Sequence, residues 1–267
     1  MTSPTTMPTN DPAVPDAAPL TVSVVVPCHN YGRFLSEALD AIDAQTRRVD
    51  EIIVCDDAST DDSWSVIEAQ AAQRPHVRVL RNETNLGAIA TFNRLVQASS
   101  GDVVLVCSAD DRYGPRYIEG TVGAIEEHGW GFAYTGHRLF GAEEAWFDAP
   151  QYDETILLRN NYIAGTSAFR REVYDAVGGF DPAFERCGME DWAFWMAAIT
   201  KGYRGGKATV GEFHWRRHEA GSRNTLSVKQ RIVLRWTLLR RNPRFFFHPR
   251  TAAYLGRLLR GGATDVG

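Results

Sequence analysis

The feature that most constrains this chain is a repeated alternation of short, continuous apolar runs with segments of helical periodicity. Residues 22–26 form one such run, and apolar side chains then recur at spacings of three and four through residues 35–42. The same alternation returns at residues 51–55, 77–80 and 103–107. Strands that are apolar on both faces belong in a parallel sheet with helices packed on each side. The pattern therefore predicts an α/β fold with a mainly parallel sheet flanked by helices.

The alternation weakens after residue 130. Residues 131–135 have the composition of one more strand, and residues 141–158 are expected to form a long loop with aromatic side chains. Helical periodicity returns at residues 170–177 and 191–200. No internal repeat and no linker rich in Pro, Gly or Ser interrupts residues 20–225, so we expect them to form one continuous domain.

The N-terminal segment differs from this domain. Residues 1–19 contain five prolines among small and polar side chains, so we expect a disordered leader. No apolar run approaches the roughly 20 residues that cross a bilayer, and no basic segment followed by an apolar stretch marks a secretion signal. The four cysteines are far apart, which indicates neither a disulfide framework nor a zinc site. These features predict a soluble, cytoplasmic chain with reduced thiols.

The C-terminal segment, residues 226–267, differs from the rest in charge. The whole chain has a formal net charge of −4, yet residues 228–260 hold nine basic and no acidic side chains, which leaves −13 for the remainder. An apolar stripe through Trp236 at helical spacing predicts a basic helical extension. It could attach to an anionic membrane surface, pack on the domain or join a second copy in a homodimer, and the sequence leaves these alternatives open.

Polar residues gather where the predicted strands end. The first strand is followed by residues 27–30 (Pro-Cys-His-Asn), the second by residues 56–59 (Asp-Asp-Ala-Ser) and the fourth by residues 108–111 (Ser-Ala-Asp-Asp). Open parallel sheets bind ligands beyond the carboxyl ends of their strands, near the point where the strand order reverses. Two acidic pairs are therefore expected to meet at one crevice, which disfavours nucleic acid as a partner.

Asp110 and Asp111 admit two interpretations. One Asp at this position could cap the start of a helix, a contact that contributes typically about 1 kcal/mol. The second carboxylate then has no role, whereas a hard divalent cation such as Mg2+ or Mn2+ prefers oxygen ligands and bridges to phosphates. We favour the metal site over the cap.

Other acidic positions and one histidine are candidates of the same kind. Asp57 could accept a hydrogen bond from a nucleobase N–H or a ribose hydroxyl. Glu190 and Asp191 open a helical segment, where they either stabilise the helix dipole or supply a general base. His218 lies in a basic, turn-rich stretch and is either a surface histidine or a partner for a diphosphate. The motifs G-x-G-x-x-G and G-x-x-x-x-G-K-[ST] are missing from the sequence, which disfavours dehydrogenases and P-loop NTPases.

Taken together, these motifs resemble those of the family 2 glycosyltransferases of the GT-A fold, over residues 21–225. The matching segments, in the family's order, are VSVVVPCHNYGRFL (22–35), EIIVCDDASTDDS (51–63), NLG (85–87) with NR (93–94), SADD (108–111), SAFRREVYDAVGGFD (167–181), ED (190–191) and HEAGS (218–222). His29 stands where the family usually has Tyr, and Ser108 stands where the family has the first Asp of D-x-D-D.

The resemblance implies a nucleotide-binding, Rossmann-like GT-A domain and the transfer of a sugar from a nucleotide diphosphate donor, most commonly UDP-linked, to a hydroxyl acceptor with inversion. Carried over residue by residue, the nucleotide sugar would contact Pro27, His29, Asn30, Asp57, Asn85, Gly87 and Asp110. A divalent metal, Mn2+ or Mg2+, would be held by Asp110, Asp111 and His218. Asp191 would be the catalytic base, and Glu190 would orient the acceptor.

Two rival functions remain. A catalytically silent protein of the same fold could bind a nucleotide sugar or glycan, which Ser108 favours and the carboxylates of Asp110, Asp111 and Asp191 disfavour. A nucleotidyltransferase is closer by fold, but those enzymes usually carry a glycine-rich basic loop after the first strand. The acceptor could be a growing polysaccharide, a lipid-linked saccharide at the inner face of the membrane, a peptide or a small natural product.

Overall fold

The computed structural model describes residues 18–184 and 188–219, together with residues 236, 237, 240 and 241. All but the last two residues of the expected leader lie outside the described residues, as does most of the basic extension. None of the helices in the described part of the chain combines the length and the apolar character that a bilayer crossing requires.

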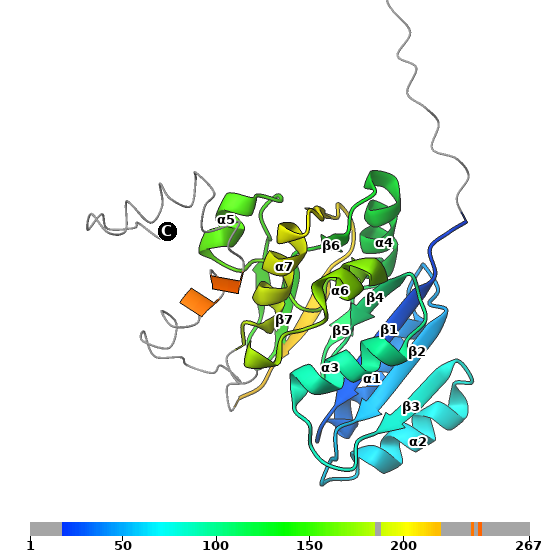
Figure 1. Ribbon diagram of the computed structural model, residues 1–267. Helices are drawn as coiled ribbons and strands as arrows, with labels where there is room; N and C mark the ends of the chain where they lie inside the picture. The colour runs from blue at the N-terminus through cyan, green and yellow to red at the C-terminus, as the bar shows by residue number, and fades with distance from the viewer. Residues whose placement is uncertain (1–17, 185–187, 220–235, 238–239, 242–267) are drawn as a thin grey trace, which may run out of the picture.

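The centre of the fold is a seven-stranded sheet with the order β10-β6-β9-β4-β1-β2-β3 (Figure 1). Its neighbouring strands are parallel except where β9 pairs with β4 and β6. The four apolar runs of the N-terminal half are strands β1 to β4, as the sequence pattern predicts. The bounds are β1 (Val22–Cys28), β2 (Glu51–Asp56), β3 (Val77–Arg81), β4 (Val103–Val106), β6 (Phe132–Tyr134), β9 (Ala168–Arg170) and β10 (Gly205–Lys207).

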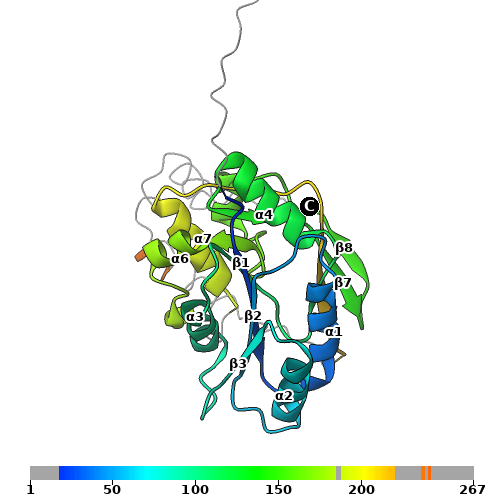
Figure 2. The ribbon, with the colours of Figure 1, turned by 90° about the vertical axis from the view of Figure 1, so that its right-hand side faces the viewer.

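Helices cover both faces of this sheet (Figure 2). One face is covered by α1 (Gly32–Asp43), α2 (Ser63–Gln73) and α4 (Tyr117–His128). The other is covered by α3 (Ala88–Ala98), α5 (Glu154–Arg159), α6 (Arg171–Val177) and α7 (Glu190–Thr200), and a 3-10 turn, η1 (Pro182–Phe184), lies between the last two. Alternate side chains of β1 enter the two cores, with Val24 and Val26 on the α1 side and Val25 on the α3 side. Burial on both faces explains why β1 is continuously apolar.

A second, four-stranded sheet lies beside the first, with the order β5-β11-β7-β8. Its strands are β5 (Arg112–Tyr113), β11 (Phe213–Arg217), β7 (His137–Gly141) and β8 (Ala145–Phe147). The expectation of a long loop at residues 141–158 is wrong, because this segment contains β8 and α5. Strand β8 pairs with β7 in an antiparallel hairpin, in which Phe147 lies opposite His137.

The strand order places the expected crevice. Strands β2 and β3 follow β1 on one side, while β4 lies on its other side, so the order reverses between β1 and β4. The chain leaves β4 through Asp110 and Asp111 and enters β5, which pairs with β11, whereas α4 begins only at Tyr117. The alternative of a helix cap at Asp110 or Asp111 is therefore wrong.

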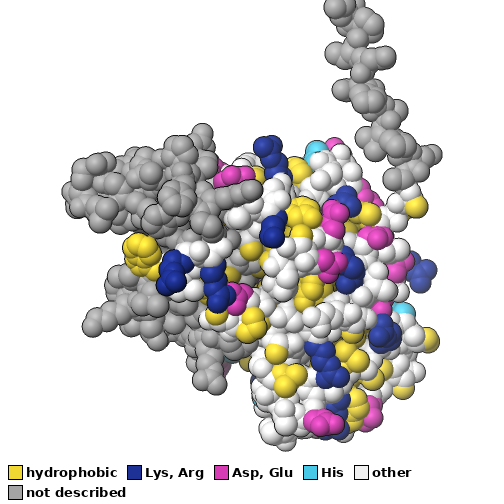
Figure 3. Space-filling view, in the orientation of Figure 1, with side chains coloured by type: hydrophobic (Ala, Val, Ile, Leu, Met, Phe, Trp, Pro, Cys, Tyr) yellow, Lys and Arg dark blue, Asp and Glu magenta, His cyan; other side chains and the backbone are white. Residues whose placement is uncertain are grey.

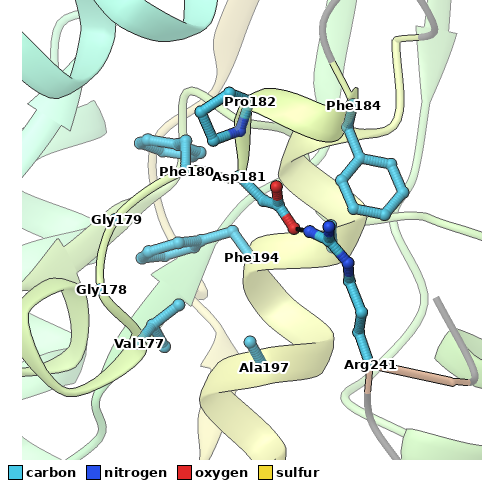
Figure 4. Close-up of a pocket in the computed structure, with 11 residues that line it drawn as sticks. Val177, Gly178, Gly179, Phe180, Asp181, Pro182, Phe184, Phe194, Ala197 and Arg241 are labelled. Carbon is cyan, nitrogen blue, oxygen red and sulfur yellow. Dashed lines mark ion pairs between the residues drawn. The ribbon is translucent and has the colours of Figure 1, made fainter. Parts of the chain in front are cut away.

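The described part of the basic extension contacts the domain beside a pocket of about 310 Å3 (Figure 4). This pocket lies between the loop after α6, η1 and α7, and Phe180 and Phe194 contribute to its apolar wall. Arg241 forms an ion pair with Asp181, and its guanidinium carbon lies 5.9 Å from the centroid of the Phe184 ring. On the face drawn in Figure 3, positive and negative side chains of the described residues are interspersed.

Candidate active site

Four residues predicted to bind the nucleotide form one hydrogen-bonded group at the ends of β1 and β2 and in the loop after β3. The Nδ1 atom of His29 lies 2.8 Å from the backbone oxygen of Asp57. Its Nε2 atom lies 3.1 Å from the side-chain amide of Asn85 and 3.2 Å from that of Asn30. A carbonyl oxygen only accepts, so we assign the ring proton to Nδ1, which leaves Nε2 to accept from the amides.

Asp57 shapes the loop that carries Asn85. Its side chain is 4% exposed, and Oδ1 accepts hydrogen bonds from the Asn82 amide at 2.7 Å and the Leu86 backbone N–H at 2.8 Å. Its Oδ2 accepts from the backbone N–H of Gly87 at 3.0 Å. Gly87 has a φ of +86°, a conformation that favours glycine. Both carboxylate oxygens are thus engaged within the protein, and contact between Asp57 and a nucleobase stays a prediction.

Pro27 and Asn30 join this group to the neighbouring turns. The backbone oxygen of Pro27 accepts a hydrogen bond from Ala109 at 3.2 Å, which ties the end of β1 to the turn that precedes Asp110. Asn30 has a φ of +60°, and its side-chain oxygen accepts from the backbone N–H of Thr60 at 2.8 Å. Asn adopts this left-handed conformation more readily than most residues. Asn30 therefore fixes the turn beside His29.

Asp110 and His218 meet at the crevice although they are far apart in the sequence. The Nε2 atom of His218 lies 2.8 Å from Oδ2 of Asp110, across 108 positions of the chain. The His218 ring stacks on Tyr31 with centroids 5.3 Å apart and an interplanar angle of 15°. Contacts with two elements thus fix the imidazole at the end of β4.

Asp111 is engaged elsewhere. Its Oδ1 accepts a hydrogen bond from the backbone N–H of Arg216 at 2.8 Å, and the residue is 6% exposed. Burial, and after it the charge of Asp110, raises the pKa of Asp111 well above its usual range. Among the described residues, no three His, Cys, Asp or Glu side chains form a metal-binding cluster. The expected trio of Asp110, Asp111 and His218 is therefore not assembled, because Asp111 bonds to β11.

A divalent cation fits the remaining pair. The 2.8 Å contact between Asp110 and His218 places a carboxylate oxygen and an imidazole nitrogen side by side. Mn2+ accepts both kinds of ligand, whereas Mg2+ prefers oxygen ligands and water. The donor set of the pair would therefore suit Mn2+ better than Mg2+.

Arg216 and Glu37 contribute contacts that the sequence motifs did not identify. The Nε atom of Arg216 donates a hydrogen bond to the backbone oxygen of Asp110 at 2.8 Å. Glu37 of α1 forms an ion pair with Arg216, whose guanidinium carbon lies 4.4 Å from the centroid of the Phe34 ring. The basic run around His218 was the available signal, but the sequence did not indicate which element it would contact.

Glu190 and Asp191 begin α7. Burial raises the pKa of Asp191 to about 7, and the neighbouring charge of Glu190 contributes to the shift. The backbone N–H of Trp192 donates to Oδ1 of Asp191 at 2.6 Å. A Cβ atom added to Gly165 would lie 3.2 Å from the Cβ of Asp191, so Gly165 packs closely against this residue. A carboxylate that changes protonation near neutral pH has the property that a general base needs.

The fold and this site define an α/β protein with an acidic centre beyond the carboxyl ends of its strands, the position at which such sheets bind ligands. The family profile described as Glycosyl transferase family 2 matches residues 23–181, more than half of the sequence, and the chain belongs to this family. A second profile, described as the N-terminal domain of galactosyltransferase, matches residues 154–219. The resemblance seen in the motifs is thereby confirmed.

Two relatives cover most of the domain. The UDP-Glc:alpha-D-GlcNAc-diphosphoundecaprenol beta-1,3-glucosyltransferase WfaP of Escherichia coli is 23% identical over 214 residues, which is 79% of this chain and 82% of that protein. The uncharacterized glycosyltransferase YwdF of Bacillus subtilis is 28% identical over 195 residues, which is 68% of this chain and 69% of that protein.

Solved structures confirm the GT-A fold. S. aureus TarS 1–349 in complex with UDP-GlcNAc has a TM-score of 0.66 at 19% identity and covers 78% of this chain. This chain spans 62% of that TarS chain, which is less than two thirds of its length. The mannosyltransferase PcManGT of Pyrobaculum calidifontis, in complex with GDP-Man and Mn2+, has a TM-score of 0.60 at 19% identity, over 93% of this chain and 79% of its own.

Proposed function

We propose that this protein is an inverting glycosyltransferase that transfers a sugar from a nucleotide diphosphate sugar to a hydroxyl acceptor, in the synthesis of a polysaccharide, a glycolipid or another glycoconjugate. The observation that carries the proposal is the pairing of Asp110 with His218 at the switch point of the sheet. Such a pair suits a diphosphate and its cation, and it adjoins the loops that would hold a nucleoside.

The donor is a UDP-sugar. TarS binds UDP-GlcNAc in its solved structure, and WfaP is named for UDP-Glc, which supports uridine as the base. The group of His29, Asn30 and Asn85 would contact the nucleoside, and Asp57 and Gly87 would hold that loop in shape. Pro27 would line the same pocket from the end of β1.

Asp110 and His218 would hold a divalent cation, with Mn2+ favoured over Mg2+. The ion would offset the negative charge that develops on the leaving diphosphate. Asp111 would support the site indirectly. It accepts a hydrogen bond from the backbone N–H of Arg216 and so fixes β11, the strand that precedes His218.

Asp191 would remove the proton from the acceptor hydroxyl, and Glu190 would orient that hydroxyl. A single carboxylate suffices for direct displacement from the face opposite the leaving group, which inverts the anomeric carbon. Retention through a covalent intermediate would require a second carboxylate beside that carbon, acting as a nucleophile.

A glycan-binding or nucleotide-sugar-binding protein without catalysis is the second candidate, favoured by Ser108 in place of an Asp and by the engagement of Asp111. Donor hydrolysis separates the two. We expect a UDP-sugar with Mn2+ to raise the apparent Tm and to release UDP slowly, because a ligand that binds the folded state stabilises it. Stabilisation without UDP release would favour the binding protein, and no response to any donor, with or without metal, would contradict both.

The location of the reaction is part of this proposal. The enzyme would act in the cytoplasm, at the inner membrane face if the acceptor is lipid-linked. The ion pair of Arg241 with Asp181 supports packing of the extension on the domain over its use as a membrane anchor. Sedimentation with vesicles containing anionic lipid tests this: we expect the full chain to stay in solution, as a chain ending at Ser227 would.

A further inference from the structure

Glu37 is an acidic side chain of α1 that the proposed mechanism does not use. It forms ion pairs with two arginines of the second sheet, Arg112 of β5 and Arg216 of β11. Its Oε1 atom accepts a hydrogen bond from Nη1 of Arg112, and its Oε2 atom accepts one from Nη2 of Arg216. Each carboxylate oxygen of Glu37 is therefore engaged with a different arginine.

The guanidinium of Arg216 is held in place beside Asp110. Its central carbon lies 4.4 Å from the centroid of the Phe34 ring and 4.3 Å from that of the Phe140 ring, and a guanidinium is attracted to the face of an aromatic ring. Its Nε atom donates to the backbone oxygen of Asp110 at 2.8 Å. The side chain of Arg216 is 15% exposed. Contacts with α1, β7 and the turn after β4 thus fix this charge next to the crevice.

An arginine in this position has a second acceptor within its neighbourhood, the carboxylate of Asp110. Pairs of an arginine with a carboxylate, joined by two parallel hydrogen bonds, are among the strongest polar contacts in proteins. In the described part of the chain, however, Arg216 pairs with Glu37, and the carboxylate of Asp110 contacts His218. Asp110 is therefore bonded to Arg216 through its backbone while its carboxylate has a neutral or titratable partner.

This choice of partner matters for a divalent cation. A guanidinium on the carboxylate of Asp110 would occupy an oxygen that the cation needs and would repel the cation by its own positive charge. Glu37 offers the guanidinium another carboxylate. Groups that orient a metal ligand without touching the metal typically contribute about 10- to 100-fold to metal affinity.

We propose that Glu37 is a positioning residue that holds Arg216 away from the carboxylate of Asp110 and so keeps that carboxylate available to a divalent cation, an inference that rests on the proposed function because it concerns the cation of that site. If Glu37 only tied α1 to the second sheet, its loss would lower stability and leave the cation affinity unchanged. The two roles therefore predict different measurements.

The test uses Glu37→Gln, which keeps the size of the side chain and loses its charge. We would titrate the full chain with Mn2+ at saturating UDP and follow bound Mn2+ by electron paramagnetic resonance. The Kd for Mn2+ is expected to rise about 10- to 100-fold, while the affinity for UDP in the presence of a chelator stays unchanged. Glu119→Gln on α4 is the matched control, because Glu119 is also 40% exposed in its side chain and pairs with Arg116. This control is expected to bind Mn2+ like the unsubstituted chain.

A double variant identifies the competing group. Arg216→Gln removes the charge and places an amide nitrogen where Nε stood, so the bond to the backbone oxygen of Asp110 can persist. In the Glu37→Gln background, this change is expected to restore most of the lost Mn2+ affinity. Arg112 is the weaker competitor, because its Nε atom donates to Nδ1 of His214 at 3.3 Å.

Three outcomes would overturn the inference: Mn2+ affinity of Glu37→Gln equal to that of the unsubstituted chain, no recovery in the double variant although thermal unfolding shows it to be folded, or no Mn2+ binding by the unsubstituted chain. The expected pattern of Mn2+ affinities in a protein that releases no UDP from any UDP-sugar would support the inference and would contradict only the proposed transferase activity.

Discussion

The crevice at the ends of β1, β2 and β4 differs from the second sheet in how fully contacts within the protein engage its side chains. In the crevice, Asp57 uses both oxygens on protein N–H groups, and His29 and Asn85 bond to each other. On the second sheet, the side chains of Trp146, Phe147 and Trp215 are each at least 40% exposed. The difference indicates that the side chains of the crevice are held in place by protein contacts before any ligand binds, whereas the aromatic side chains of the second sheet stay open to solvent.

Removing the proposed base gives the largest expected effect. Asp191→Asn is nearly the same size, and we expect kcat to fall by about 1000-fold, because general-base catalysis contributes about 100- to 10,000-fold. Donor affinity, measured by titration with a UDP-sugar, is expected to stay unchanged. Asp175→Asn, at an exposed position of α6, is the control. Turnover of Asp191→Asn equal to that of the unsubstituted chain would remove Asp191 from the mechanism.

Removing the carboxylate of Asp57 is expected to lower both the stability of the protein and its affinity for the donor. Asp57→Ala leaves the Leu86 N–H without its acceptor and removes one of the two acceptors of the Gly87 N–H, which keeps Oδ1 of Asn85. The expected loss is about 2–3 kcal/mol of unfolding free energy, measured by urea denaturation, with donor affinity at least tenfold weaker. Asp62→Ala, at an exposed site nearby, should change neither quantity. Full donor affinity in Asp57→Ala would show that the loop does not depend on this carboxylate.

The raised pKa of Asp191 predicts a pH profile. A base must be ionised, so with a pKa of about 7 the rate is expected to fall about tenfold per pH unit below 7 and to level off above it. Initial rates at saturating donor measure this. A midpoint near the ordinary aspartate value of 3.8 would exclude Asp191 as the rate-controlling base.

The raised pKa of Asp191 also predicts an effect on stability. A rise in pH that increases the rate is expected to lower the stability of the folded protein. Because the folded state binds this proton more tightly than the unfolded chain does, the contribution of Asp191 to stability declines as the pH rises from about 3.8 to about 7. Asp191→Asn cannot ionise and is therefore expected to raise the Tm at pH 8 by about 2–4 °C, as about 1 kcal/mol does in a domain of this size. At pH 4 the two proteins should melt alike.

The smallest effect is expected at the contact of the extension. Asp181→Asn removes the ion pair with Arg241, whose side chain is about half exposed, so the expected loss is under about 0.5 kcal/mol. Thermal unfolding in low and high salt measures it, because salt screens an exposed pair. A loss above about 2 kcal/mol would show that the extension is an integral part of the domain.

The sequence predicted most of the N-terminal half of the fold. Apolar runs and helical periodicity identified β1 to β4 and their helices, because a strand that is buried on both faces is apolar at nearly every position. The second sheet was missed, since β5 has two residues and pairs with β11 about a hundred positions later. Pairing between distant short segments leaves no local periodicity. The antiparallel insertion of β9 between β4 and β6 was missed for the same reason.

The sequence identified more of the residues in the candidate site than of the contacts between them. Asp110 and His218 were expected together, and the structure brings them together. Asp111 was expected beside them, but its bond to Arg216 could be known only once β11 was placed. Tyr31, which stacks on His218, follows the first strand without any mark that separates it from a surface aromatic residue.

The separation of Asp110 from His218 has a consequence for how the enzyme is made. The ribosome adds about 5–20 residues per second, so Asp110 emerges on the order of 10 s before His218, its partner in the crevice. During that interval the nascent polypeptide has Asp110 without His218. A newly made chain therefore forms the contact between Asp110 and His218 only at the end of translation of the domain.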